Sequence, residues 1–224
     1  MKRHFDDELK KIKDKLFRMG LLAEQALEKA TTAFFERDIK KAQEVIQCDQ
    51  EINLQEIEVD ELAHELIALY QPAAVDLRLL TMVLKVNNDL ERMGDQAVNI
   101  AQAVVIISQY PPLKPSEDLR KIAGEVRGLM RDALKAFMEK DQEKAKRILE
   151  ADDGIDQLND KIYDEIQNML SEKPQYIRIG VAFLMVSHNL ERVADLATNI
   201  AEDVIYLERG VDIRHHIRER REES

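Results

Sequence analysis

The chain has 224 residues, of which 45% are apolar, so it can form one large domain or two domains of roughly 100 residues with a buried core. Its 7 Gly and 5 Pro are too few for the turns of a β-sandwich or barrel, and its charged fraction of 34% favours long helices. The formal net charge of −11 disfavours binding to nucleic acid or anionic lipid, which depends on Lys and Arg.

The N-terminal residues lack the apolar segment of a signal peptide, and no stretch approaches the roughly 20 apolar residues of a membrane span. Cys48 is the only cysteine, which excludes an internal disulfide and suits a reducing compartment. The sequence therefore predicts a cytoplasmic protein with no membrane span.

Apolar residues recur at three- and four-residue spacing through most of the chain, which is the period of an α-helix. Asp38 and Ser116 are suited to cap the start of a helix, and Pro72 to its first turn. Short connections between long helices predict antiparallel neighbours. The expected helices span about residues 5–36, 38–70, 72–110, 116–139, 141–171 and 174–208, and Gly210 is expected to close the last of them.

The two halves of the chain repeat one another. Residues 90–101 read LERMGDQAVNIA and residues 190–201 read LERVADLATNIA, with eight of the twelve positions identical. Each copy lies on a helix expected to start at a proline. The sequence predicts an all-α fold of two tandem, pseudo-symmetric three-helix bundles. Its parts are a first repeat, 1–110, a Pro-rich linker, 111–115, a second repeat, 116–210, and a charged C-terminal tail, 211–224.

The repeated signature Glu-Arg-x-x-Asp lies on the third helix of each half. A heptad that starts at Leu90 directs one stripe of apolar residues to the core and a stripe of oxygen and nitrogen donors away from it. The core stripe is Leu90, Met93, Ala97, Ile100 and Val104, matched by Leu190, Val193, Ala197, Ile200 and Val204. The donor stripe is Asn88, Glu91, Asp95, Asn99 and Gln102, matched by His188, Glu191, Asp195, Asn199 and Glu202.

The two acids of each signature are four residues apart, so their carboxylates are neighbours on the helix surface. No Lys or Arg lies four residues from any of them to offset the repulsion. The second helix of each half is acidic too, and carboxylates from both helices would together suit a hard cation, or iron or manganese with His188. The candidate metal ligands are Glu91, Asp95, Glu191 and Asp195, with Asn99, Asn199, His188, Glu202, Glu56, Asp60, Asp160 and Asp164 as further candidates.

Two simpler interpretations stand beside metal binding. The acids can form a solvated face, because surface carboxylates are common, and Arg92 and Arg192 can form ion pairs that fix the packing of the helices. The chain has no Gly-x-Ser-x-Gly and no Gly-rich phosphate-binding loop, so no catalytic residue is predicted.

The duplicated L-E-R-x-x-D-x-A-x-N-I-A resembles the PhoU family of phosphate-uptake regulators, and the resemblance covers nearly the whole chain. It implies a cytoplasmic, non-enzymatic homodimer that acts between the ATPase subunit of a phosphate ABC transporter and a sensor histidine kinase. Such a protein would repress the phosphate-starvation response when phosphate is ample. The resemblance also implies clusters of iron or another metal at Glu91 and Asp95, and at Glu191 and Asp195.

Two other classes of protein remain open from the sequence. A di-iron or di-manganese enzyme would carry Glu-x-x-His motifs that project into the bundle core, whereas this chain has the reverse order, His188-x-x-Glu191, once. A metal-free structural helical protein is the other alternative.

Overall fold

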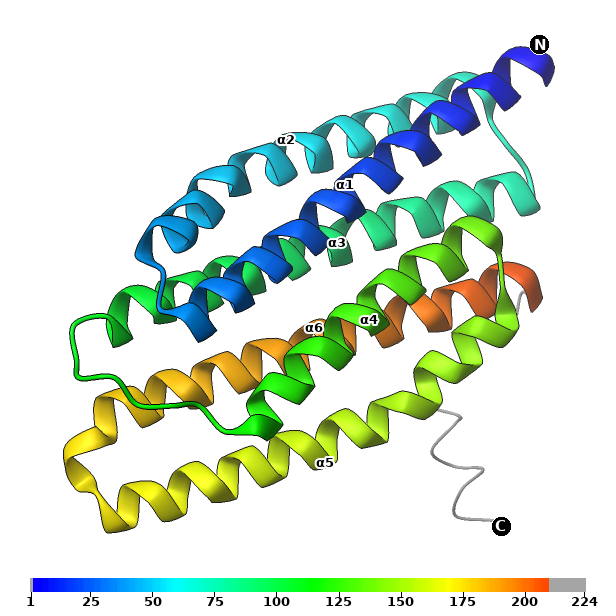
Figure 1. The fold of residues 1–224 in the computed structure, drawn as a ribbon. Helices are drawn as coiled ribbons and strands as arrows, with labels where there is room; N and C mark the ends of the chain where they lie inside the picture. Colours follow the sequence, from blue (N-terminus) through cyan, green and yellow to red (C-terminus); the bar gives the residue numbers. More distant parts are fainter. Residues whose placement is uncertain (1, 210–224) are drawn as a thin grey trace, which may run out of the picture.

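The computed structural model describes residues 2–209, and it confirms the predicted all-α fold and its duplicated unit. Three long helices in the first half are followed by three in the second, with one short 3₁₀-helix between the last two (Figure 1). No helix among these residues is both long and apolar enough to cross a bilayer. The elements are α1 (Lys2–Glu36), α2 (Ile39–Tyr70), α3 (Val75–Ile107), α4 (Glu117–Glu139), α5 (Gln142–Glu172), η1 (Pro174–Tyr176) and α6 (Ile177–Arg209).

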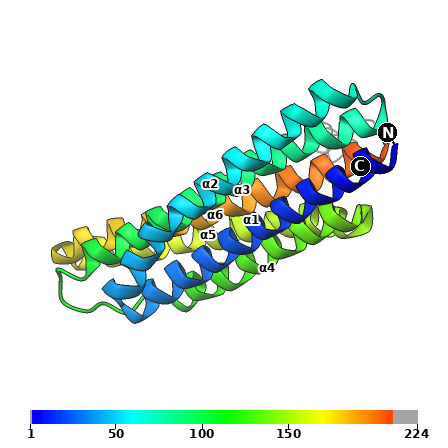
Figure 2. The same cartoon turned by 90° about the horizontal axis from the view of Figure 1, so that it is seen from above.

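The two three-helix bundles lie side by side along their length. Helices α1, α2 and α3 pack together, as do α4, α5 and α6, and the halves meet where α3 packs against α6 and α1 against α4. Seen from above, α1 and α4 lie toward one face, and α2, α3, α6 and α5 toward the other (Figure 2). α3 and α6 run antiparallel and form the centre of that second face.

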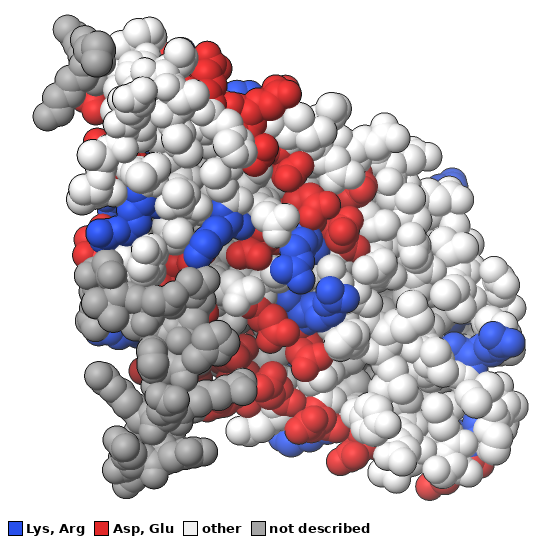
Figure 3. All heavy atoms as spheres, turned by 180° about the vertical axis from the view of Figure 1, so that it is seen from behind, with Lys and Arg blue, Asp and Glu red and all other residues white. Residues whose placement is uncertain are grey.

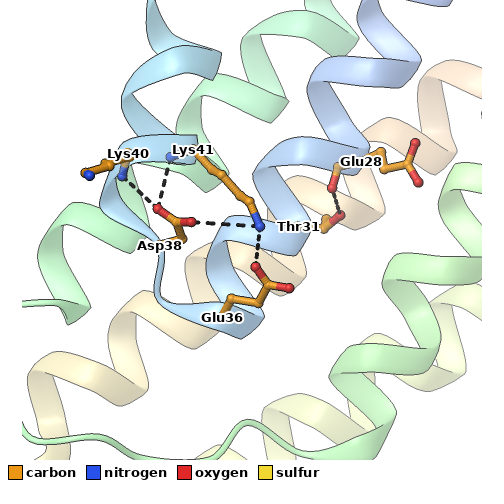
Figure 4. A network of polar contacts seen from close by, with 6 residues as sticks. All are labelled: Glu28, Thr31, Glu36, Asp38, Lys40 and Lys41. Atoms are coloured by element: carbon orange, nitrogen blue, oxygen red, sulfur yellow. Dashed lines mark hydrogen bonds and ion pairs between the residues drawn. The ribbon is translucent and has the colours of Figure 1, made fainter.

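The turn between the first two helices of each half has the same construction. Asp38 accepts hydrogen bonds from the backbone amides of Lys40 and Lys41, which caps α2, and Lys41 also pairs with Glu36 (Figure 4). The preceding residue, Arg37, has a left-handed backbone with φ 56°. The second half repeats this turn with Lys140 at φ 55°, the cap Asp141 and the pair Lys144–Glu139.

Three predicted helix ends differ from the structure. Pro72 was expected to open the third helix, but α3 begins at Val75, because Gln71 has a left-handed backbone that ends α2 and Pro72 lies in the connection that follows. α3 ends at Ile107, and residues 108–110 form a turn instead of continuing the helix. Pro174 starts the three-residue η1 rather than α6 itself. Gly210 and the predicted tail, 211–224, lie outside the described residues.

The predicted core stripe of each signature helix is buried. All ten of its residues have no exposed surface: Leu90, Met93, Ala97, Ile100, Val104, Leu190, Val193, Ala197, Ile200 and Val204. The two halves share this core, since the rings of Phe34 on α1 and Phe183 on α6 meet edge to face with centroids 5.4 Å apart. Burial of these stripes sets the rotation of α3 and α6, and therefore fixes where the signature acids face.

Candidate functional site

The acids of the first signature share a surface with α2. Glu91 is half-buried and Asp95 is exposed. Burial raises the pKa of the Glu91 carboxyl, and Asp95, Glu56 and Asp49 add to the effect by repulsion. The pKa of Asp95 is also raised, first by partial loss of water and then by Asp49. The structure therefore brings two acids of α2, Asp49 and Glu56, beside the signature of α3.

The second signature is built in the same way beside α5. The pKa of Asp195 is raised by burial first, then by repulsion from Glu191 and from Asp156 of α5. The imidazole of His188 lies against Glu191, with Nδ1 3.0 Å from Oε2. His188 and the signature carboxylate of Glu191 therefore lie together on α6.

The other predicted residues contribute less to these clusters. Asp60 lies beside the exposed His64, with 3.3 Å between a carboxylate oxygen and Nδ1. Asp160 and Asp164 are exposed on α5, and the α5 acid that acts on Asp195 is instead Asp156. The remaining three lie on the signature helices: Asn99 and Glu202 are partly buried, and Asn199 is exposed.

Asp49 and Asp156 were not among the predicted ligands. Asp49 has no acid four residues away on its own helix, whereas Asp156 lies four residues before the predicted Asp160. Asp49 and Glu56 are seven residues apart, with the buried Ile52 between them, so both lie at the edge of the stripe by which α2 packs on α3. This heptad spacing beside a core residue was the signal available in the sequence.

The carboxylates do not form a ready-made metal cage. Among residues 2–209, no three His, Cys, Asp or Glu side chains are placed so that they could hold one ion. A bound cation usually requires more ligands than two carboxylates supply. Ca²⁺ takes six to eight oxygen ligands, Mg²⁺ takes six ligands, and structural Zn²⁺ takes four. The residues as placed therefore do not fit a multinuclear metal cluster held by side chains alone.

The arginine of a signature lies near the opposite half of the molecule. Arg192 of α6 lowers the pKa of Asp95 on α3, against the raising effects of burial and Asp49. On the face formed by α2, α3, α6 and α5, acidic side chains gather in a band with basic ones among them (Figure 3). Arg192 therefore acts across the boundary between the halves, whereas Arg92 pairs with Asp89 of its own helix, with 3.9 Å between Nη1 and Oδ1.

A hollow of about 440 Å³ lies on the seam between α3 and α6. Two buried carboxylates line it, Asp89 and Asp203, and Lys85 reaches Asp203 with 3.3 Å between Nζ and Oδ1. Burial, then repulsion from Asp203, raises the pKa of Asp89 to about 6. The other lining residues are Leu84, Asn88 and Asn199. No sequence pattern singled out this hollow, because it depends on which residues of two distant helices meet.

These features define a duplicated helical-bundle protein that presents acidic faces, a construction suited to contacts with other molecules. A family model described as "PhoU domain" matches the chain twice, at residues 16–104 and 119–204, and the chain belongs to the PhoU family. The predicted resemblance is thereby confirmed.

Relatives agree with this assignment over nearly their full length. The chain is 36% identical over 216 residues to the "Phosphate-specific transport system accessory protein PhoU homolog" of Aquifex aeolicus, covering 96% of this chain and 98% of that protein. The crystal structure of PhoU from Pseudomonas aeruginosa superposes with a TM-score of 0.89 at 33% identity, covering 92% of this chain and 100% of that one. The phosphate transport system regulatory protein PhoU from Streptococcus pneumoniae gives 0.87 at 30% identity, covering 93% and 98%.

Proposed function

We propose that this protein regulates phosphate uptake as an accessory protein of a phosphate transport system. The observation that carries the proposal is the match to PhoU proteins across nearly the whole chain, in sequence and in structure. The relatives are named as accessory or regulatory proteins, and the two related acidic faces suit a role based on binding. The family assignment favours this role over an enzymatic one.

In its finer form, the proposal is that the protein acts in the cytoplasm as an adaptor. It would contact the ATPase subunit of a phosphate ABC transporter and a sensor histidine kinase, and would repress the phosphate-starvation response when phosphate is ample. The duplicated construction supports this form, because one folded unit carries two related but unequal halves. A homodimer is the proposed working state.

A deletion strain tests the regulatory role. Without the gene, we expect phosphate-starvation genes to be expressed in high phosphate and phosphate uptake to rise. Complementation with the wild-type gene should restore repression. Unchanged expression and uptake in the deletion strain would show that the proposed function is wrong. A pull-down from phosphate-replete cells, probed separately for the ATPase subunit and for the kinase, tests the adaptor.

Metal binding forms a second part of the proposal. The signature carboxylates supply oxygen ligands, but the described side chains offer at most pairs, so water or groups of a partner would have to complete the coordination. Elemental analysis of purified protein, with Glu91→Ala and Glu191→Ala as controls, is the measurement. We expect the amount of bound metal per protein to fall in each variant by the share that the altered face holds in the wild type. Equal metal in wild type and both variants would contradict this part and favour metal-free faces.

A further inference from the structure

The two ends of the seam between α3 and α6 carry different side chains at positions that the duplication makes equivalent. Two contacts fix the antiparallel register: Lys85 Nζ lies 3.3 Å from Asp203 Oδ1, and Arg78 Nη1 donates to the Leu207 carbonyl at 3.2 Å. Continued along the same two helices, this register places Ile106 opposite Val181. One end thus joins the start of α3 to the end of α6, and the other joins the end of α3 to the start of α6 (Figure 1).

At the first end, charged groups cover the ring of Tyr206, while Val75 and Leu77 at the start of α3 stay 55% and 38% exposed. The guanidinium of Arg78 and the ammonium of Lys85 lie over the ring of Tyr206, at 5.7 Å and 6.0 Å from its centroid. Lys85 also pairs with the buried Asp203. At this end, cationic side chains of the protein therefore cover the ring of Tyr206 and border the hollow lined by Asp89 and Asp203.

At the second end, the positions equivalent to Thr81, Lys85 and Tyr206 hold exposed apolar residues. Thr81 and Lys85 of the first half correspond to Val181 and Met185 of the second, and Tyr206 corresponds to Ile106. Ile177, Val181 and Met185 follow one another at four-residue spacing on α6, and they are 57%, 47% and 39% exposed. Ile106 of α3 is 38% exposed. We call these four residues the apolar end of the seam.

The apolar end continues directly into the acidic band. Steps of three or four residues along α6 lead from Val181 and Met185 to His188, Glu191 and Asp195 on the same side of the helix. Figure 3 shows few charged side chains where the end of α3 and the start of α6 lie, and the band of acids next to that area. One continuous surface therefore changes from apolar to acidic over roughly 30 Å of helix.

The negative charge of this surface indicates which kind of partner can bind to it. A second copy of this chain would bring another strongly acidic surface against the band, since the net charge is −11. Anionic lipid would be repelled in the same way. A helix with apolar residues along one half and Lys or Arg along the other half of the same face complements both parts.

We propose that the outer side of α6, together with Ile106 of α3, is the docking surface for a basic amphipathic helix of a partner protein, with its apolar residues on Ile106, Ile177, Val181 and Met185 and its basic residues on Glu191 and Asp195. This deepens the proposed adaptor function and rests on it for biological meaning. The partner helix would therefore carry apolar side chains along one half of its length and Lys or Arg side chains along the other half of the same face.

A synthetic peptide of roughly 20 residues, which spans about 30 Å as a helix, provides the probe. It carries Leu at helical spacing in one half and Lys in the other half of the same face, with a fluorescent label for anisotropy. A second peptide with every Lys replaced by Glu is its control. We expect saturable binding of the Lys peptide, weakened by salt, and no saturable binding of the Glu peptide.

The chain offers its own matched variant. Val181→Thr combined with Met185→Lys installs the residues of the equivalent first-half positions at exposed sites, so the fold should be kept, which circular dichroism verifies. We expect binding of the Lys peptide to weaken about tenfold or more. Leu54→Thr combined with Leu69→Lys removes apolar surface that is 60% and 66% exposed on α2 and should leave binding unchanged.

Three results would overturn the proposal. They are equal binding of both peptides, equal binding to the Val181/Met185 variant, and sedimentation showing a wild-type dimer that this variant loses while neither peptide binds. The last result would assign the surface to a second copy of the chain. The titration uses purified protein only, so its failure leaves the deletion phenotype untouched, and a normal deletion strain would not alter the titration.

Discussion

Asp89 is a carboxylate buried beside another carboxylate, Asp203, whereas its counterpart in the second half is the neutral Asn189. Its side chain faces Asp203 across the seam and Lys85 and Arg92 on its own helix, and the two cations only partly offset the effects of burial and repulsion. A carboxylate placed in this way opposes folding, because the charged form has lost water without gaining a sufficient partner.

Replacing Asp89 by Asn should therefore stabilise the protein at neutral and high pH. The pKa of about 6 in the folded state lies above the ordinary value of 3.8, so the folded protein binds the proton more tightly than the unfolded chain. Stability is then lost as pH rises from about 4 to about 6 and stays reduced above that range. We expect Asp89→Asn to raise the free energy of unfolding by about 1–3 kcal/mol at pH 8 and by much less at pH 4.

Urea denaturation of both proteins from pH 4 to pH 8 measures this difference. The mirrored substitution, Asn189→Asp, places a carboxylate at the equivalent buried position, where the Asn189 amide now donates to the Met185 carbonyl at 2.6 Å. It should destabilise most at high pH. Stability differences that do not change with pH in either variant would contradict the assigned role of the Asp89 charge.

Among the elements, the two left-handed turns look alike but should respond differently to glycine. Lys140 makes only a surface ion pair with Glu208 at 3.6 Å, and its charge adds to the burial that lowers the pKa of Lys13. Arg37 instead donates through Nη2 to the carbonyls of Ile107 and Tyr110, which ties the end of α3 to α1. Both residues carry the strain of a left-handed backbone, but only the side chain of Arg37 offsets it with tertiary hydrogen bonds.

Lys140→Gly should leave stability unchanged or raise it by up to about 1 kcal/mol, because glycine accepts positive φ without strain. Arg37→Gly gains the same relief but leaves two carbonyl groups without their guanidinium donor, so we expect a net loss of about 1–2 kcal/mol. Thermal unfolding of the two variants under one set of conditions provides the comparison. Equal shifts in both would show that the Arg37 hydrogen bonds contribute nothing.

How far the sequence predicts these elements depends on what positions them. The core stripe from Leu90 onward and the cap Asp38 follow from spacing and residue type within one helix, so both are found in the structure. The start of α3 does not, because Pro72 suits either the first turn of a helix or the connection after one. The neighbours of the signature, such as Asp49, depend on how α2 packs on α3, which spacing along one helix does not specify.

At the scale of the whole molecule, the two halves form one folding unit rather than two independent domains. α1 approaches α4 so closely at Gly20 that a Cβ there would lie 2.5 Å from a methyl carbon of Leu134. Near the other end of α1, Phe34 is fully buried and its ring meets Phe183 of α6. Core residues of each half therefore contact the other half. A substitution that destabilises the core of one half should also destabilise the other half.

Phe34→Ala tests this coupling. The change removes a buried ring at the junction of α1 and α6, so we expect a loss of about 3–5 kcal/mol in the free energy of unfolding. Hydrogen exchange followed by mass spectrometry should show faster exchange in α6 as well as in α1, because Phe183 loses the ring it packs against. Exposed Phe17→Ala, at 37% exposure on the same helix, is the control and should change neither region strongly. Faster exchange confined to α1, α2 and α3 would mean that the two halves unfold independently, and that a partner bound on one half could not influence the other through the shared core.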